Sequence, residues 1–190
     1  MTIQLADILV DLREDHRNIA ILLDLLDREI DRIRDGGKPD YELIHDIMRY
    51  MTVYSDAVHH PKEDVLYAAV KKDQPDLAEG LERVGPEHAE LADLGESLRN
   101  DIEAIASGAA VTRKRLLADA SDYVERQRHH MAWEETDLFP RADTLANAEM
   151  AMFLDIEHLN RLDPVFGPER EHSFVNLLEN IKSFVDESAA

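Results

Sequence analysis

Apolar residues recur three or four positions apart along four long stretches of this chain, and short clusters of glycine, proline and polar residues separate the stretches. In the first stretch this series runs through Leu5, Leu9, Leu12, His16, Ile19, Leu23, Leu26, Ile30 and Ile33. The spacing is that of one face of an α-helix, and the alternation typical of strands is absent. The pattern therefore predicts no strand and long helices over residues 4–34, 40–71, 76–107 and 111–138.

The breaks between these stretches are short, at residues 36–40, 72–76 and 107–108. Because short connections hold sequential helices antiparallel, we expect an all-α fold, an up-down-up-down four-helix bundle over residues 1–142. Residues 143–190 are predicted to form an accessory C-terminal helical region packed on the bundle, with helices near 145–159 and 168–186. Pro86 lacks the amide proton that a helix interior needs, so it should kink or restart the third helix.

Composition excludes several classes of protein. The chain has 190 residues, enough to bury one core, and 21 basic against 41 acidic side chains, a net charge of −20. Such a surface repels phosphate backbones and anionic lipid, so we expect neither a nucleic-acid nor a membrane partner. The absence of cysteine excludes disulfides and thiolate metal sites. No long apolar run or signal-peptide pattern is found, and we expect a soluble, cytoplasmic domain.

Four histidines are predicted to share one level of the bundle. At the first turn, His16 lies 18 residues before the helix end at 34, and His59 lies 19 after the helix start at 40. At the second turn, His59 lies 12 residues before the helix end at 71, and His88 lies 12 after the helix start at 76. At the third turn, His88 lies 19 residues before the helix end at 107, and His130 lies 19 after the helix start at 111. In antiparallel helices, equal distances from a shared turn mean equal height. At about 1.5 Å per residue, the four side chains should agree in height to within a few ångströms.

Two of these histidines have a glutamate one helical turn later. His59 precedes Glu63 by four residues and His130 precedes Glu134 by four, so each pair shares a helix face. Burying four imidazoles and two carboxylates is costly unless a cation binds them together. Six such ligands exceed what one ion usually takes when room is left for water or substrate, so two ions are favoured. A nitrogen and oxygen donor set suits iron or manganese, and also zinc.

The segments around these residues carry a family resemblance. They read Asp15-His16-Arg17-Asn18, His59-His60-Pro61-Lys62-Glu63, Glu87-His88-Ala89-Glu90-Leu91 and the segment from His130 through Glu134-Glu135 to Leu138-Phe139-Pro140. The chain resembles the hemerythrin-like HHE cation-binding family over roughly residues 5–142. The resemblance implies a non-haem centre of two iron ions with oxo- or carboxylate-type bridges. It also implies the metal ligands, which are His16, His59, Glu63, His88, His130 and Glu134.

Two positions differ from the oxygen-carrying hemerythrins. Those proteins have a second histidine one turn after the third-helix histidine, where this chain has Ala92, and an aspartate five residues after the fourth-helix histidine, where this chain has Glu134 at four. Both differences favour the HHE proteins over the dedicated oxygen carriers. His60 is a possible additional ligand, because it follows His59 and precedes Glu63 by three residues.

Other patterns favour ordinary roles. A ferritin-like site would use Glu-x-x-His motifs, and two occur here, at 42–45 and 169–172, but both stand beside breakers at predicted helix starts. His129 points about 100° away from His130 and is expected at the surface or behind the ligands. Three carboxylates are predicted to orient ligand imidazoles, namely Asp15, Asp64 and Glu135.

Three classes of function stay open. The first is an open dinuclear iron site that binds or senses O2, NO, peroxide or iron status. The second is a di-iron oxidoreductase that decomposes peroxide or donates iron in stress and repair. The third is a helical bundle with a structural or zinc-occupied site. Within the first class, a small diatomic molecule or peroxide is the expected partner.

Overall fold

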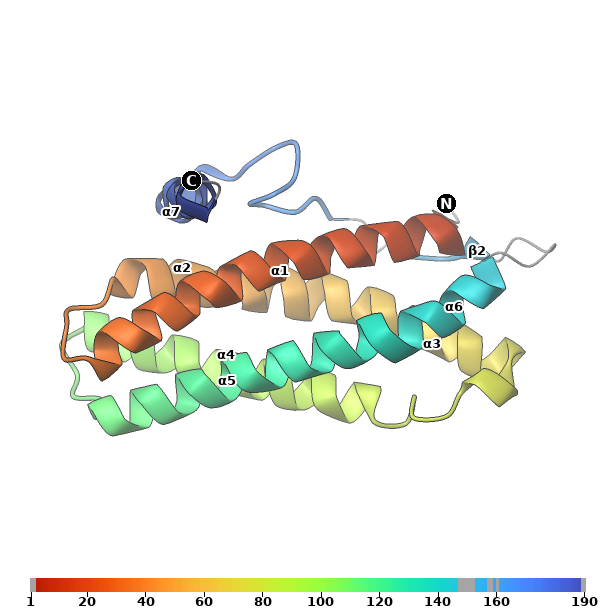
Figure 1. Ribbon diagram of the computed structural model, residues 1–190, viewed down its shortest axis with the longest axis horizontal. Helices are drawn as coiled ribbons and strands as arrows, with labels where there is room; N and C mark the ends of the chain where they lie inside the picture. The colour runs from red at the N-terminus through yellow and green to blue at the C-terminus, as the bar shows by residue number, and fades with distance from the viewer. Residues whose placement is uncertain (1–2, 147–152, 157–158, 160, 189–190) are drawn as a thin grey trace.

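The computed structural model describes residues 3–146, 153–156, 159 and 161–188, and these residues form a helical bundle (Figure 1). The first long helix is α1, Leu5–Arg34. The second rod is continuous and consists of α2 (Tyr41–Tyr50), a π-helical segment η1 (Met51–His59) and α3 (His60–Asp73). The third is α4, Val84–Ala106. The last rod consists of α5 (Arg113–Trp133), a π-helical segment η3 (Glu134–Leu138) and α6 (Phe139–Ala146).

Local sequence explains where these helices begin and end. Asp40 and Thr112 precede α2 and α5, and their side chains accept hydrogen bonds from the amides of Leu43 and Arg115, which would otherwise be unpaired at a helix start. Gly36 and Gly108 follow α1 and α4 with φ angles of 86° and 84°. That left-handed conformation ends a helix and favours glycine.

Apolar side chains form two core clusters, and a layer of polar side chains separates them along the helices. One cluster includes Ile19, Val58 and Met131, and continues toward the α1–α2 turn. The other includes Leu12, Leu66, Tyr67, Val84 and Phe139, and lies toward the opposite end. On the first three rods the predicted metal ligands fall between these two clusters, and on the fourth His130 and Glu134 lie on either side of Met131, where the first cluster ends. The apolar core is therefore interrupted at one level of the bundle, and the predicted metal ligands lie at that level.

The accessory region lies against one side of the bundle. A 3₁₀ turn, η5 (His172–Phe174), leads into α7, Val175–Ser188, which packs against α2 and α1 (Figure 1). Val165, Phe174 and Leu177 belong to the same core cluster as the bundle helices. The proposed division into a domain of residues 1–142 and an accessory region of 143–190 stays a prediction.

Four predictions about local structure were wrong. The third helix begins at Val84 rather than at 76, because residues 75–77 form a 3₁₀ turn and Pro86 takes a place in the first helical turn, where its missing amide proton costs nothing. A helix near 145–159 is contradicted by the described part, since Ile3–Gln4 (β1) pairs antiparallel with Phe153–Leu154 (β2). That strand pair also contradicts the prediction of no strand. Residues 147–152, 157 and 158 of that predicted helix lie outside the described residues. The last helix begins at Val175 rather than near 168.

None of the helices among the described residues combines the length and apolar character that crossing a membrane requires.

Candidate metal centre

Seven side chains that can bind a cation gather in the polar layer, and all seven are buried. They come from every rod of the bundle. The set is His16, His59, His60, Glu63, His88, His130 and Glu134. The set contains two groups, and inside each group all ligand atoms lie within 4.8 Å of one another. The first group is His60, Glu63, His88 and His130, and the second is His16, His59 and Glu63.

Glu63 belongs to both groups. Its Oε1 lies 3.4 Å from Nε2 of His16 and 3.3 Å from Nε2 of His59. Its Oε2 lies 3.4 Å from Nε2 of His88. The two oxygens of one carboxylate therefore face histidines of two different groups, which is the arrangement of a bridging ligand.

Glu134 lies between the groups in a different way. Its Oε2 lies 3.5 Å from Nε2 of His16 and 3.3 Å from Nε2 of His130. Its Oε1 lies 4.0 Å from Nε2 of His88 and accepts a 2.9 Å hydrogen bond from the hydroxyl of Tyr67. Only one oxygen of Glu134 is thus free of a hydrogen bond.

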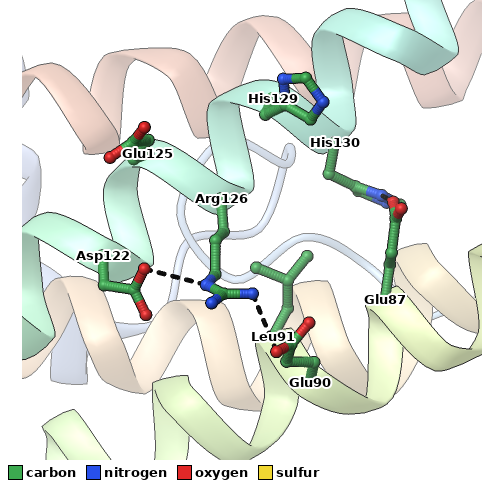
Figure 2. Close-up of a pocket in the computed structure, with 8 residues that line it drawn as sticks. All are labelled: Glu87, Glu90, Leu91, Asp122, Glu125, Arg126, His129 and His130. Atoms are coloured by element: carbon green, nitrogen blue, oxygen red, sulfur yellow. Dashed lines mark hydrogen bonds and ion pairs between the residues drawn. The ribbon is translucent and has the colours of Figure 1, made fainter.

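Each of the four histidines predicted from the sequence turns its Nδ1 toward a carboxylate and its Nε2 inward. The pairs are Glu135 with His16 (2.9 Å), Asp15 with His59 (3.1 Å), Asp64 with His88 (3.0 Å) and Glu87 with His130 (3.0 Å). Figure 2 shows the last pair, with Glu87 of α4 facing His130 of α5. A carboxylate at Nδ1 fixes the ring orientation and makes the other nitrogen a better metal ligand.

The two halves of the bundle repeat one sequence pattern, because His16, His59 and Glu63 correspond to His88, His130 and Glu134, and this repeat explains the contacts. In each half, the residue before the first histidine holds the histidine of the following rod, as Asp15 holds His59 and Glu87 holds His130. The residue after each glutamate contacts the first histidine of the opposite half. Asp64 contacts Nδ1 of His88, and Glu135 contacts Nδ1 of His16. Sequence reasoning identified three of these carboxylates and missed Glu87, although its place before His88 matches that of Asp15 before His16.

His60 lies inside the site. Its imidazole is buried and stacks on that of His88, with ring centroids 4.3 Å apart. Consecutive residues of an α-helix point about 100° apart, yet His59 and His60 are both buried. The π-helical turn that ends at His59 changes the helical register at this point, and such turns are frequent at functional sites.

Burial and charge act against each other on the titratable groups here. Burial lowers the pKa of His16, but hydrogen bonds to Glu134, Glu135 and Glu63 outweigh it and raise that pKa to about 11. The pKa of His88 is likewise lowered by burial but raised overall to about 10 by Asp64 and Glu63. Burial raises the pKa of Glu63, yet His59, His16 and His88 hold it well below its usual value. Without a cation, the raised pKa values of His16 and His88 favour their protonated forms beside the ionised Glu63.

The unpaired atoms of this layer fit a bound cation. Buried polar atoms normally have hydrogen-bond partners, yet none is found for Nε2 of His16, Nε2 of His59, both nitrogens of His60, both oxygens of Glu63 and Oε2 of Glu134. Nε2 of His88 also lies 3.1 Å from Nε2 of His130, so two nitrogen lone pairs converge on one point unless a proton lies between them. A bound metal ion could take one ligand atom from each side chain of either group.

Two surface pockets adjoin the layer. One, of about 340 Å³ between α4 and α5, reaches His130 and is lined by carboxylates that include Glu87 and Glu90 (Figure 2). The other, of about 430 Å³ between α1 and α5, reaches His16 and Met131. His129 is exposed on the rim of the first pocket, and His45 lies with Asp46 and Glu103, away from the centre. The glutamates of the two Glu-x-x-His motifs, Glu42 and Glu169, are absent from both ligand groups among the described residues.

Comparison with known protein families also indicates a cation-binding domain. Residues 7–142 match the family model described as the hemerythrin HHE cation binding domain. Searches of curated proteins and of solved structures find no match. The family match covers more than half of the chain and includes every residue of the buried cluster. The chain belongs to the hemerythrin HHE cation-binding domain family.

Proposed function

We propose that this chain is a non-haem di-iron protein that binds a small ligand, O2, NO or peroxide, at an open dinuclear site. The observation that carries the proposal is the position of Glu63, whose two oxygens face two separate groups of histidines. A carboxylate in that position joins two cations and is neutralised by them, whereas one cation would leave half of the cluster unpaired. The proposal keeps the up-down-up-down order of four helices predicted from the sequence.

The proposed ligands are the six residues predicted from the sequence together with His60. His16 and His59 would bind one ion, His60, His88 and His130 the other, and the glutamates would be shared. His60 thereby supplies from α3 a third imidazole, which the oxygen carriers supply from the third helix and which is missing here at Ala92. The buried imidazole of His60 supports this role, because its Nε2 has no hydrogen-bond partner and its Nδ1 lies 3.3 Å from Oδ1 of Asp56, so that this ring also has a carboxylate at Nδ1.

The donor count supports an open site. Five imidazoles and two bridging carboxylates offer at most nine donor atoms, against about twelve positions for two octahedral ions. The group with fewer protein donors is that of His16, His59 and Glu63. We therefore expect the small ligand at this ion, on the side where a pocket of about 430 Å³ reaches His16.

Iron is favoured because the donors are imidazole and carboxylate without sulfur, and because structural zinc sites rarely exceed four ligands. When bound, paired iron supplies electrons to O2, NO or peroxide. The chain itself holds the imidazoles in place through four carboxylates and keeps bulk water from a buried layer.

The test is metal analysis, with an optical spectrum, of protein purified in air. Two iron ions per chain and near-ultraviolet charge-transfer bands that change on adding NO or azide are expected. The Glu63→Ala variant should lose the paired centre. A folded protein that takes up zinc alone and stays unchanged when Fe(II) is added would refute the proposal.

A further inference from the structure

The two glutamates of the centre are held differently, and a tyrosine makes the difference. Both oxygens of Glu63 lack a hydrogen-bond partner, whereas Oε1 of Glu134 accepts the 2.9 Å bond from Tyr67. Tyr67 is 5% exposed and lies on α3, one turn after Glu63. Its hydroxyl therefore reaches a proposed metal ligand on another rod of the bundle.

Tyr67 stays a neutral donor in this position. A tyrosine hydroxyl ordinarily loses its proton only near pH 10, and here it lies 2.9 Å from Oε1 of Glu134. A neutral phenol in a buried position keeps its proton for a partner, and a hydrogen bond to an ionised carboxylate is among the stronger ones. The bond thus holds Oε1 of Glu134 aside and presents Oε2, which lies between His16 and His130.

The internal repeat shows that only one glutamate is restrained in this way. Leu66-Tyr67 in α3 corresponds to Leu138-Phe139, with the extra residue of the second half absorbed by the π-helical segment Glu134–Leu138. Phe139 is buried and its ring stacks on His16 at 5.1 Å. A phenylalanine cannot donate a hydrogen bond, so the equivalent restraint on Glu63 is absent.

We propose that Tyr67 is a positioning residue that holds Glu134 as a one-oxygen ligand and so keeps open the coordination position that the small ligand takes. This inference rests on the proposed dinuclear function. With Oε1 of Glu134 held aside, the protein offers eight rather than nine donor atoms to the two ions. Without the hydroxyl, Oε1 is free to turn toward the ions and compete with the ligand.

The test compares Tyr67→Phe with Tyr50→Phe by titrating the iron-loaded proteins with azide. Tyr50 is the matched control, because its buried hydroxyl also donates to a carboxylate, Asp163 at 2.8 Å, that is no part of the centre. Tyr67→Phe should keep two ions per chain and bind azide about tenfold to a hundredfold more weakly. That change in affinity corresponds to the free energy of one hydrogen bond to a charged group. Tyr50→Phe should bind azide like the unmodified chain.

A second measurement does not depend on iron chemistry. The visible spectrum of the Co(II)-loaded proteins reports coordination number, and Tyr67→Phe alone should show the weaker bands of higher coordination. Equal azide affinity and equal Co(II) spectra in Tyr67→Phe and the unmodified chain would overturn the inference, as would loss of metal from Tyr67→Phe. An unmodified chain that binds no pair of ions would overturn the proposed function itself.

Discussion

Replacing Asp15 with asparagine should weaken metal binding more than the same change at Asp64. Both carboxylates accept a hydrogen bond from the Nδ1 of a histidine in the centre, at 3.1 Å and 3.0 Å. They differ in exposure, because the side chain of Asp15 is 8% exposed and that of Asp64 is 52% exposed. Water can replace a lost carboxylate at the exposed position but has little access to the buried one.

The expected size follows from the role of such carboxylates. Loss of a partner behind a metal-bound histidine typically costs tenfold to a hundredfold in affinity, roughly 1.4 to 2.7 kcal/mol. Asp15→Asn should fall at the upper end, because Asp15 is buried and also accepts a hydrogen bond from Tyr54 at 3.2 Å. Asp64→Asn should fall at or below the lower end. The loss of affinity in Glu87→Gln and Glu135→Gln should lie between these two values. It should be larger for Glu87→Gln, whose side chain is 26% exposed, than for Glu135→Gln, whose side chain is 36% exposed.

The assay is equilibrium titration of the metal-free protein with Fe(II), without oxygen and in competition with a chelator. Asp31→Asn is the control, since its side chain is 65% exposed on α1 and pairs with Arg34. Affinities that fall equally in all four variants, or more for Asp64→Asn than for Asp15→Asn, would refute the reasoning from burial.

Two further predictions concern His60 and pH. His60→Leu should weaken binding of the ion at His88 and His130, yet raise the free energy of unfolding of the metal-free protein by about 1–3 kcal/mol, because it removes a buried imidazole whose Nε2 has no partner and whose Nδ1 approaches Asp56 at 3.3 Å without a hydrogen bond. Calorimetry and metal titration measure the two effects, and a less stable metal-free variant contradicts the assignment. The raised pKa values of His16, about 11, and His88, about 10, mean that their protons stabilise the metal-free fold fully below about pH 6.5, and that this stabilisation is lost as pH rises through 10 and 11. Melting temperatures of the metal-free protein should therefore fall from pH 7 to pH 10, and metal uptake should release protons; a flat profile in this range would show that the two histidines are neutral.

The sequence predicted the level of the site better than it predicted the helices that build it. At the turns joining α1 to α2 and α4 to α5, the equal distances from helix ends hold, because those connections are short. At the turn joining α3 to α4, the predicted helix start is residue 76, whereas α4 begins at Val84. His88 still reaches Glu63, because residues 74–83 cover the missing height without a continuous helix.

The rest needed the three-dimensional arrangement. Hydrophobic periodicity describes regular helices, so it gave no sign of the π-helical segments 51–59 and 134–138, which lie directly beside the histidines and glutamates. The hydrogen bond between Tyr67 and Glu134 joins residues 67 positions apart, and the strand pair joins residues 3–4 to 153–154. Neither leaves a periodic signal, because each depends on how separate rods pack.

The most direct test of the account is a crystal structure of the iron-loaded protein with anomalous diffraction data at the iron edge. The account predicts two iron peaks in the buried layer, with Oε1 of Glu63 on the ion bound by His16 and His59 and Oε2 on the ion bound by His88 and His130. A single peak, or two ions that do not share Glu63, would contradict it.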